Sequence, residues 1–239
     1  MASNYRRSVI MPPVTKNLII INAIMWVATI LLKQRGLIDL DEILGLHFWR
    51  ASDFHIYQFF TYMFMHDSSS FSSGITHIFF NMFSLWMFGI LLERVMGAKR
   101  YIFFYLSCGL GAALVQELVW QFAFGDLSGY TGVNTGTEVI PIDQFYNFLI
   151  TVGASGAVFG ILLAFGVLFP NIPIYIMFIP IPVKAKWVVI GYGVVELLFG
   201  VTRTMDNVAH FAHLGGMLFG ALILFYWKKK GVFDRYHEF

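Results

Sequence analysis

The sequence has little charge. Only 13% of its 239 residues are Asp, Glu, Lys or Arg, whereas 58% are hydrophobic and the mean hydropathy is +0.69. A water-facing surface normally needs about a quarter of its residues charged, so the composition argues against a soluble protein. The charges cluster between long apolar runs, which is typical of a polytopic helical membrane protein. The net charge of +2 gives no indication of nucleic-acid binding, because the basic residues flank the apolar runs.

Cysteine is also nearly absent. The single Cys108 lies in an apolar run and excludes a disulfide framework. A cleavable leader is not indicated either, because no small-residue cleavage site follows the run that starts after Arg6 and Arg7 and ends at Leu32. We therefore expect this run to be retained as a first membrane span.

The apolar runs predict an all-α fold, a polytopic bundle of six transmembrane helices. The expected spans are Leu18–Leu32, His77–Leu92, Tyr101–Phe124, a helix within Phe145–Phe169, Trp187–Val201 and Val208–Trp227. This divides the chain into an N-terminal tail at 1–17, a six-span core at 18–227 and a basic C-terminal tail at 228–239.

The connections between the spans differ in length. The first, residues 33–76, has aromatic patches too short to span, so we expect it to lie at the interface and to re-enter the membrane in part. Within it, Ser68–Ser73 is expected to be a flexible polar insert. Gly125–Gln144 is expected to be a loop, and Pro170–Lys186 a proline-rich hairpin.

The distribution of Lys and Arg predicts the orientation. If the N-terminus is inside, the inner segments hold 12 of the 16 basic residues, and the outer segments hold only Lys33, Arg35, Arg50 and Arg203. We therefore expect both termini in the cytoplasm. Spans two, four and six then begin at the outer face.

Polar side chains inside spans are costly and are functional candidates. His77 and Asn81 share a face of span two at i,i+4 spacing. If the fourth helix begins near Ser155, it is about 22 Å long, short of the ~30 Å core, so it starts below the outer surface beside a water-filled cavity. His213 lies about 8 Å into span six, at a similar depth.

Small residues allow spans four and six to approach closely. Gly156 and Gly160 on one, and Gly216 and Gly220 on the other, are small-xxx-small patterns.

A serine and a histidine in contact can act as a nucleophile and a general base. Each feature alone has a structural alternative: helix packing for the glycine-flanked serine, a hydrogen-bonded histidine, or a helix-crossing polar pair. Glu117 and Glu196 are expected to face partners within the bundle.

Taken together, the residues resemble the rhomboid family of intramembrane serine proteases over about residues 18–227. The motifs that carry the resemblance are His77-x-x-x-Asn81, Glu93-Arg94-x-x-Gly97 followed by Arg100, Gly153-Ala154-Ser155-Gly156, and Ala212-His213-Leu214-Gly215-Gly216. The resemblance implies Ser155 as nucleophile and His213 as general base in a dyad, with no third, orienting carboxylate. It implies His77 and Asn81 as oxyanion donors beside the Ser155 amide.

The sequence departs from the family pattern in three places. Tyr57-Gln58 stands where many members carry a Trp-Arg pair, and an extra segment, Ser68–Gly74, separates His66 from His77. The aromatic residue that often packs on the catalytic histidine is here Phe159.

The resemblance implies an endopeptidase that cleaves transmembrane or membrane-adjacent segments of other membrane proteins, at the outer side. The expected partners are such substrates and membrane lipid, without metal, organic cofactor or nucleic acid. The compact core suggests a bacterial inner membrane. The alternative function is that of a catalytically silent rhomboid-like protein that binds and escorts membrane clients. The sequence indicates neither the substrate nor the oligomeric state.

Overall fold

The computed structural model describes residues 11–127, 129–134, 136, 138–175, 181–202 and 209–233. The tail through residue 10, Arg203, the start of the expected sixth span at Val208, and residues 234–239 lie outside the described residues.

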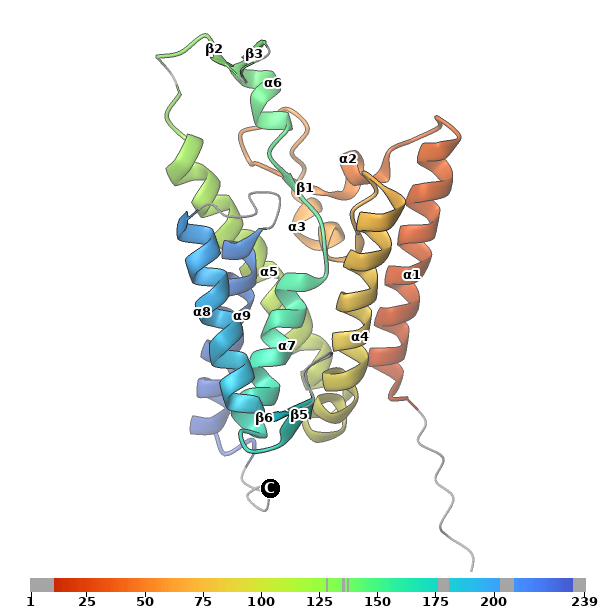
Figure 1. Ribbon diagram of the computed structural model, residues 1–239, viewed down its shortest axis with the longest axis vertical. Coiled ribbons are helices and arrows are strands. Elements are labelled where there is room, and N and C mark those ends of the chain that lie inside the picture. Colours follow the sequence, from red (N-terminus) through yellow and green to blue (C-terminus); the bar gives the residue numbers. More distant parts are fainter. Residues whose placement is uncertain are drawn as a thin grey trace, which may run out of the picture.

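In the described residues, six helices form the bundle (Figure 1): α1 (Pro13–Gln34), α4 (Phe71–Met96), α5 (Ala98–Phe124), α7 (Ser155–Leu168), α8 (Ala185–Thr202) and α9 (His210–Lys229). In the described part of the chain, five of them are long and apolar enough to cross a membrane, and α7 is a shorter apolar helix. Each expected span coincides with one of these helices, so the predicted polytopic helical fold is confirmed.

Short elements connect the helices. The first connection contains α2 (Leu40–Leu44), β1 (Leu46–His47), α3 (Gln58–Thr61) and the 3₁₀ helix η1 (Tyr62–Phe64). The others contain β2 (Gly132–Asn134), β3 (Val139–Pro141), α6 (Ile142–Asn147), β4 (Ile150–Thr151), β5 (Pro173–Tyr175) and β6 (Pro182–Lys184). The strands pair antiparallel as β1 with β4, β2 with β3 and β5 with β6. The expected hairpin between α7 and α8 is confirmed, and the expected loop after α5 contains a second one.

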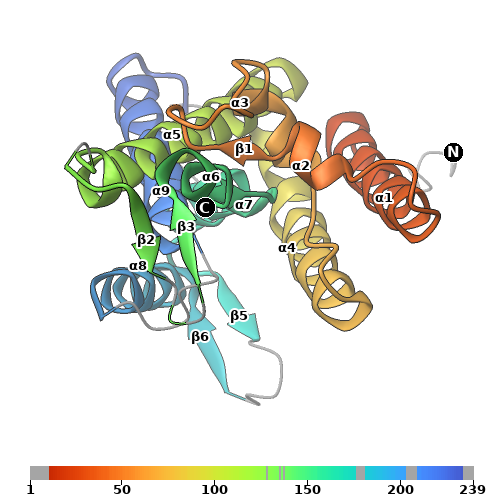
Figure 2. The same cartoon turned by 90° about the horizontal axis from the view of Figure 1, so that it is seen from above.

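The short helix α7 is the centre of the bundle. It packs against α4, α5, α8 and α9, and Figure 2 shows it among them in the view from above. Most of its side chains are buried, and Ile161 is fully so. In Figure 1 its upper end lies well below the upper ends of α4 and α5.

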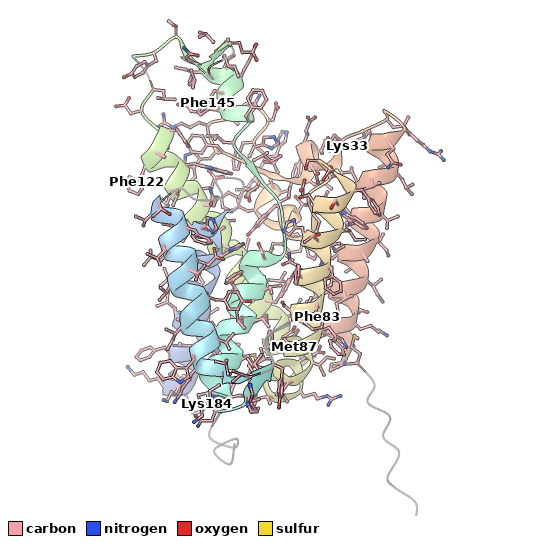
Figure 3. All side chains as sticks on the ribbon, in the orientation of Figure 1. Lys33, Phe83, Met87, Phe122, Phe145 and Lys184 are labelled. Carbon is pink, nitrogen blue, oxygen red and sulfur yellow. The ribbon has the colours of Figure 1, made fainter. Side chains whose placement is uncertain are left out.

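The outer faces of the long helices are apolar. Large hydrophobic side chains are exposed on each of them, among them Ile24, Phe79, Phe122, Leu198 and Phe225. Phe122, 88% exposed, projects away from the bundle in Figure 3. Because such faces are unfavourable in water and suit lipid, the structure is that of an integral membrane protein.

Helix α4 begins earlier than expected. The side chain of Ser70 accepts a hydrogen bond from the Ser73 amide (3.1 Å), a normal N-cap arrangement. The helix starts at Phe71, so the prediction of a flexible insert at Ser68–Ser73 is wrong for most of that segment. Its serines read as polar linker residues in the sequence, but one of them caps the helix.

Glu93, near the end of α4, caps a neighbouring helix. Its carboxylate accepts the amides of Val14 (3.0 Å) and Thr15 (2.7 Å) in the first turn of α1, and the Thr15 hydroxyl (2.8 Å). These amides have no partner within their own helix, and a negative charge is favoured at a helix N-terminus. The contact fixes α1 against α4 at the end opposite to the serine of α7.

Candidate active site

Helix α7 begins at Ser155, which meets the condition under which the sequence indicated a short fourth helix. The chain reaches it through β4, which pairs with β1 at Leu46↔Thr151, and through Gly153, whose amide donates to the Tyr62 carbonyl oxygen (2.9 Å). Gly153 has φ +137°, a conformation that side-chain-bearing residues rarely adopt. With 14 residues, α7 is about 21 Å long. Its first-turn amides, including that of Ser155, are therefore presented below the upper end of the bundle.

The structure brings Ser155 and His213 together. The Ser155 Oγ and the His213 Nε2 are 2.7 Å apart, although the residues belong to α7 and α9. Ser155 is half-buried and His213 is buried. The glycine patterns make this contact possible, because a Cβ at Gly216 would lie 1.8 Å from the Gly156 carbonyl oxygen. The expected close packing of these two helices is thus observed.

The face of the His213 ring is covered by Phe159. The two rings are stacked with centroids 4.3 Å apart and planes inclined by 6°. Phe159 lies one turn after Ser155, so one helix supplies both the hydroxyl and the packing surface for the imidazole. This is the contact that the sequence analysis expected.

A carboxylate contacts the second ring nitrogen of His213. The Oε2 atom of Glu196, in α8, is 2.9 Å from the Nδ1 of His213 and 2.7 Å from the Nδ1 of His210. The expectation that no third carboxylate would be present is therefore wrong for this chain. In the sequence, Glu196 is a single acidic residue within an apolar run. That pattern does not show which neighbouring helix its side chain faces.

Glu196, His210 and His213 are also the kinds of side chain that bind metal ions. Their candidate ligand atoms all lie within 4.8 Å of one another. The separations of 2.7 and 2.9 Å are, however, those of hydrogen bonds, whereas two ligands on one tetrahedral zinc ion would stand about 3.3 Å apart. The three side chains as placed therefore fit a hydrogen-bonded unit better than a metal centre.

His77, on α4, lies close to Gly153 and Ser155. Its Nδ1 accepts a long hydrogen bond from the Asp67 amide (3.4 Å), which puts the ring proton on Nε2. A Cβ built at Gly153 would lie 3.0 Å from that Nε2 and 3.5 Å from the Ser155 Oγ. A donor N–H and the serine oxygen thus flank one backbone position.

Asn81 lies one turn further along α4. Its Nδ2 donates to the His77 carbonyl oxygen (2.9 Å), and the residue is buried. One of its two amide protons is engaged within α4, and the other is available to an acceptor. Its part as an oxyanion donor stays a prediction.

The His66 ring packs against the His77 ring. The two rings meet edge to face with centroids 5.0 Å apart, and the His66 Nε2 is 2.9 Å from the Asn22 Oδ1 of α1. Burial, with a smaller contribution from His77, lowers the pKa of the His66 imidazole to about 3. A neutral His66 therefore holds the connection in place.

Gln58, one of the two residues at which the sequence departs from the expected family pattern, organises the first connection. It is fully buried, and its Oε1 accepts the amides of His47 (3.3 Å) and His55 (3.1 Å). Its Nε2 donates to the carbonyl oxygens of Asp53 (2.9 Å) and Ile43 (3.2 Å). One neutral amide thus holds a loop whose contacts the sequence pattern did not reveal.

Comparisons with known proteins identify the same family that the sequence resembles. The Rhomboid domain family model matches residues 53–230. The chain is 29% identical over 153 residues to Rhomboid protein 1, mitochondrial, of Saccharomyces cerevisiae, and 31% identical over 157 residues to Rhomboid protease AarA of Providencia stuartii. It is 27% identical over 205 residues to RHOMBOID-like protein 1 of Arabidopsis thaliana.

These matches cover different shares of the proteins. They include 64%, 63% and 85% of this chain for the yeast, Providencia and Arabidopsis proteins, in that order. They span 38%, 50% and 41% of those relatives, so the chain matches about half or less of each one's length.

Proposed function

The chain belongs to the rhomboid family, and from this membership we propose that it is an intramembrane serine endopeptidase. Its substrates are transmembrane or membrane-adjacent segments of other membrane proteins. The observation that carries the proposal is the 2.7 Å separation between the Ser155 Oγ and the His213 Nε2 at the start of α7. In support, one of the relatives named above is called a rhomboid protease.

The proposed reaction follows the serine-protease scheme. His213 Nε2 accepts the hydroxyl proton while the Ser155 Oγ attacks the scissile carbonyl carbon, and it then returns the proton to the leaving amine. Water hydrolyses the acyl-enzyme in the second half. The oxyanion is stabilised by the Ser155 amide at the helix N-terminus and by the side chains of His77 and Asn81. None of these steps needs a metal or an organic cofactor.

The proposed location is a bacterial inner membrane with both termini in the cytoplasm. The basic residues support this orientation, because they favour the end where α1 begins and α9 finishes. Ser155 lies toward the opposite, outer face, and the water for hydrolysis enters from there.

The test is cleavage and labelling by the purified protein. We expect a fluorophosphonate probe to label the wild type at Ser155, and a single-span reporter to be cut. Ser155→Ala and His213→Ala should abolish cleavage without unfolding the bundle. The control is Ser107→Ala, the same change at a half-buried serine of α5, which should leave cleavage unchanged.

Cleavage retained by purified Ser155→Ala would refute the mechanism. A wild type that binds single-span clients but neither labels nor cuts them would instead favour the silent, escorting member of the family.

A further inference from the structure

Glu196 is a buried carboxylate in the apolar helix α8. Its side chain is only 11% exposed, and its polar partners among the described residues are two imidazoles, those of His210 and His213. Placing a carboxylate inside a membrane bundle is costly, and such residues are retained for function more often than for stability. The contact with His213 is on the side of the ring that faces away from Ser155.

The hydrogen bonds fix the form of the imidazole. An ionised carboxylate only accepts hydrogen bonds, so the proton of His213 stands on Nδ1 and is donated to Glu196 Oε2. The Nε2 is then free of a proton and accepts the hydroxyl of Ser155. This is the tautomer that a general base requires.

We propose that Glu196 is a positioning residue for His213. It holds the imidazole in the reactive tautomer and orientation, and its charge stabilises the imidazolium that forms when the Ser155 proton moves to Nε2. The unit at work is thus Ser155–His213–Glu196 rather than a dyad. This inference rests on the proposed function.

His210 completes the arrangement. Its Nδ1 donates to the same Oε2 atom (2.7 Å), so two N–H groups orient one carboxylate oxygen. The helices α8 and α9 are in close contact here, since a Cβ at Gly200 would lie 3.0 Å from the Phe211 ring and 3.4 Å from the His210 Cβ. The carboxylate therefore has little freedom to turn away.

The charge of Glu196 has a measurable consequence. Among the described residues, the titratable groups near His213 are Glu196 on α8, His210 on its own helix and His77 on α4. Of these, only Glu196 carries a negative charge. Removing this charge makes the imidazolium less favourable, so the acid limb of the pH–rate profile moves to lower pH. A residue that merely fills space would not move that limb.

The test measures the rate of fluorophosphonate labelling against pH, which needs no knowledge of the natural substrate. We expect Glu196→Gln to slow labelling by about 10- to 100-fold, less than the ~10⁴-fold loss when a triad aspartate becomes asparagine. The acid limb should move to lower pH. The matched control is Glu117→Gln, the same change at a buried glutamate of α5 that accepts the Trp49 amide (2.8 Å), with rate and limb unchanged.

A second variant tests the inference independently, in case Glu196→Gln does not fold. His210→Phe keeps an aromatic ring and removes one donor from Glu196, so the charge acts more fully on His213 and the acid limb should move to higher pH. A labelled wild type with no movement of the limb in either variant would overturn the inference and leave the protease proposal standing. A wild type that is not labelled at all would instead refute the protease proposal.

Discussion

At the scale of single residues, the site is made by hydrogen-bond partners that decide where each proton lies. The Asp67 amide on the His77 Nδ1 leaves the Nε2–H of His77 directed toward Gly153, and the carboxylate of Glu196 leaves the Nε2 of His213 without a proton. One histidine is thus set as a donor and the other as an acceptor on opposite sides of Ser155. Neither role is visible from the residue types alone, because both are histidines.

The first prediction concerns the oxyanion donors. Asn81→Ala should lower kcat on a cleaved reporter by about 100-fold, since the loss of one such donor costs on the order of 3 kcal/mol, and KM should change little. Asn171→Ala, at an exposed position after α7, is the control and should be neutral. An unchanged kcat in Asn81→Ala would move the donor role to another group.

The second prediction concerns His66 and pH. Because the folded protein keeps this imidazole neutral down to about pH 3, the unfolded state binds more protons between pH 3 and about 6.5. Stability should fall as the pH drops through this window, by about 2 kcal/mol at pH 5 from this group. Thermal unfolding in detergent should show a smaller loss between pH 7 and pH 5 in His66→Gln than in the wild type.

The control for that measurement is His55→Gln, on the same connection but exposed, which should keep the wild-type pH dependence. Equal losses in all three proteins would contradict the assignment to His66.

At the scale of the helices, the contact between α7 and α9 sets the distance between the proposed nucleophile and base. The Gly156 and Gly216 backbones meet with no room for a side chain, and Cys108 of α5 fills the space beside Gly160. The serine and the histidine stand at the upper ends of these two helices. A separation of the helices by a fraction of an ångström therefore lengthens the Ser155–His213 contact directly.

The third prediction follows from this packing. Gly216→Ala should lower the stability by about 1–3 kcal/mol and cut cleavage at least tenfold, because its Cβ meets a backbone oxygen that cannot turn aside. Gly191→Ala in α8 is the matched control, since nothing lies within 4 Å of its Cβ, and there alanine should stabilise the helix slightly. Activity of Gly216→Ala at the wild-type level would show that the helices can part without harm.

How far the sequence predicted these features depends on the kind of feature. The sequence indicated a short α7 on the condition that it begins near Ser155, and the family resemblance implied the stacking of Phe159. Both features depend on residues that lie close together in one helix. Glu196 was recognised as a bundle residue, but its partner depends on how α8 is rotated, and that is decided by packing against α9. The role of Gln58 could not be foreseen, because the connection has no periodic pattern and its bonds run to separated backbone groups.

At the scale of the whole molecule, the two ends of the bundle differ. One end carries α6 and the first connection, where Ser52 bonds to Asn147, and the other carries the β5–β6 hairpin. Figure 3 shows Lys33 near the first end and Lys184 at the second. The proposed orientation places the first end outside.

The fourth prediction tests that orientation. Cys108 is fully buried, so the wild type should not react with a membrane-impermeant maleimide and serves as the control. In intact cells Ser52→Cys should be labelled and Lys184→Cys should not, since both positions are exposed but on opposite sides. Both should react once the membrane is permeabilised, and labelling of Lys184→Cys alone in intact cells would reverse the orientation.

The short central helix also bears on how the protein is made. A helix of 14 residues preceded by extended backbone cannot rest alone in lipid, because its polar groups would have no partners there. It needs α4 and α5, synthesised before it, and α8 and α9, synthesised after it, packed around it. The proposed nucleophile is thus translated 58 residues before the proposed base. On the proposed mechanism, a nascent chain cannot cleave its neighbours in the membrane until its last helix has been inserted.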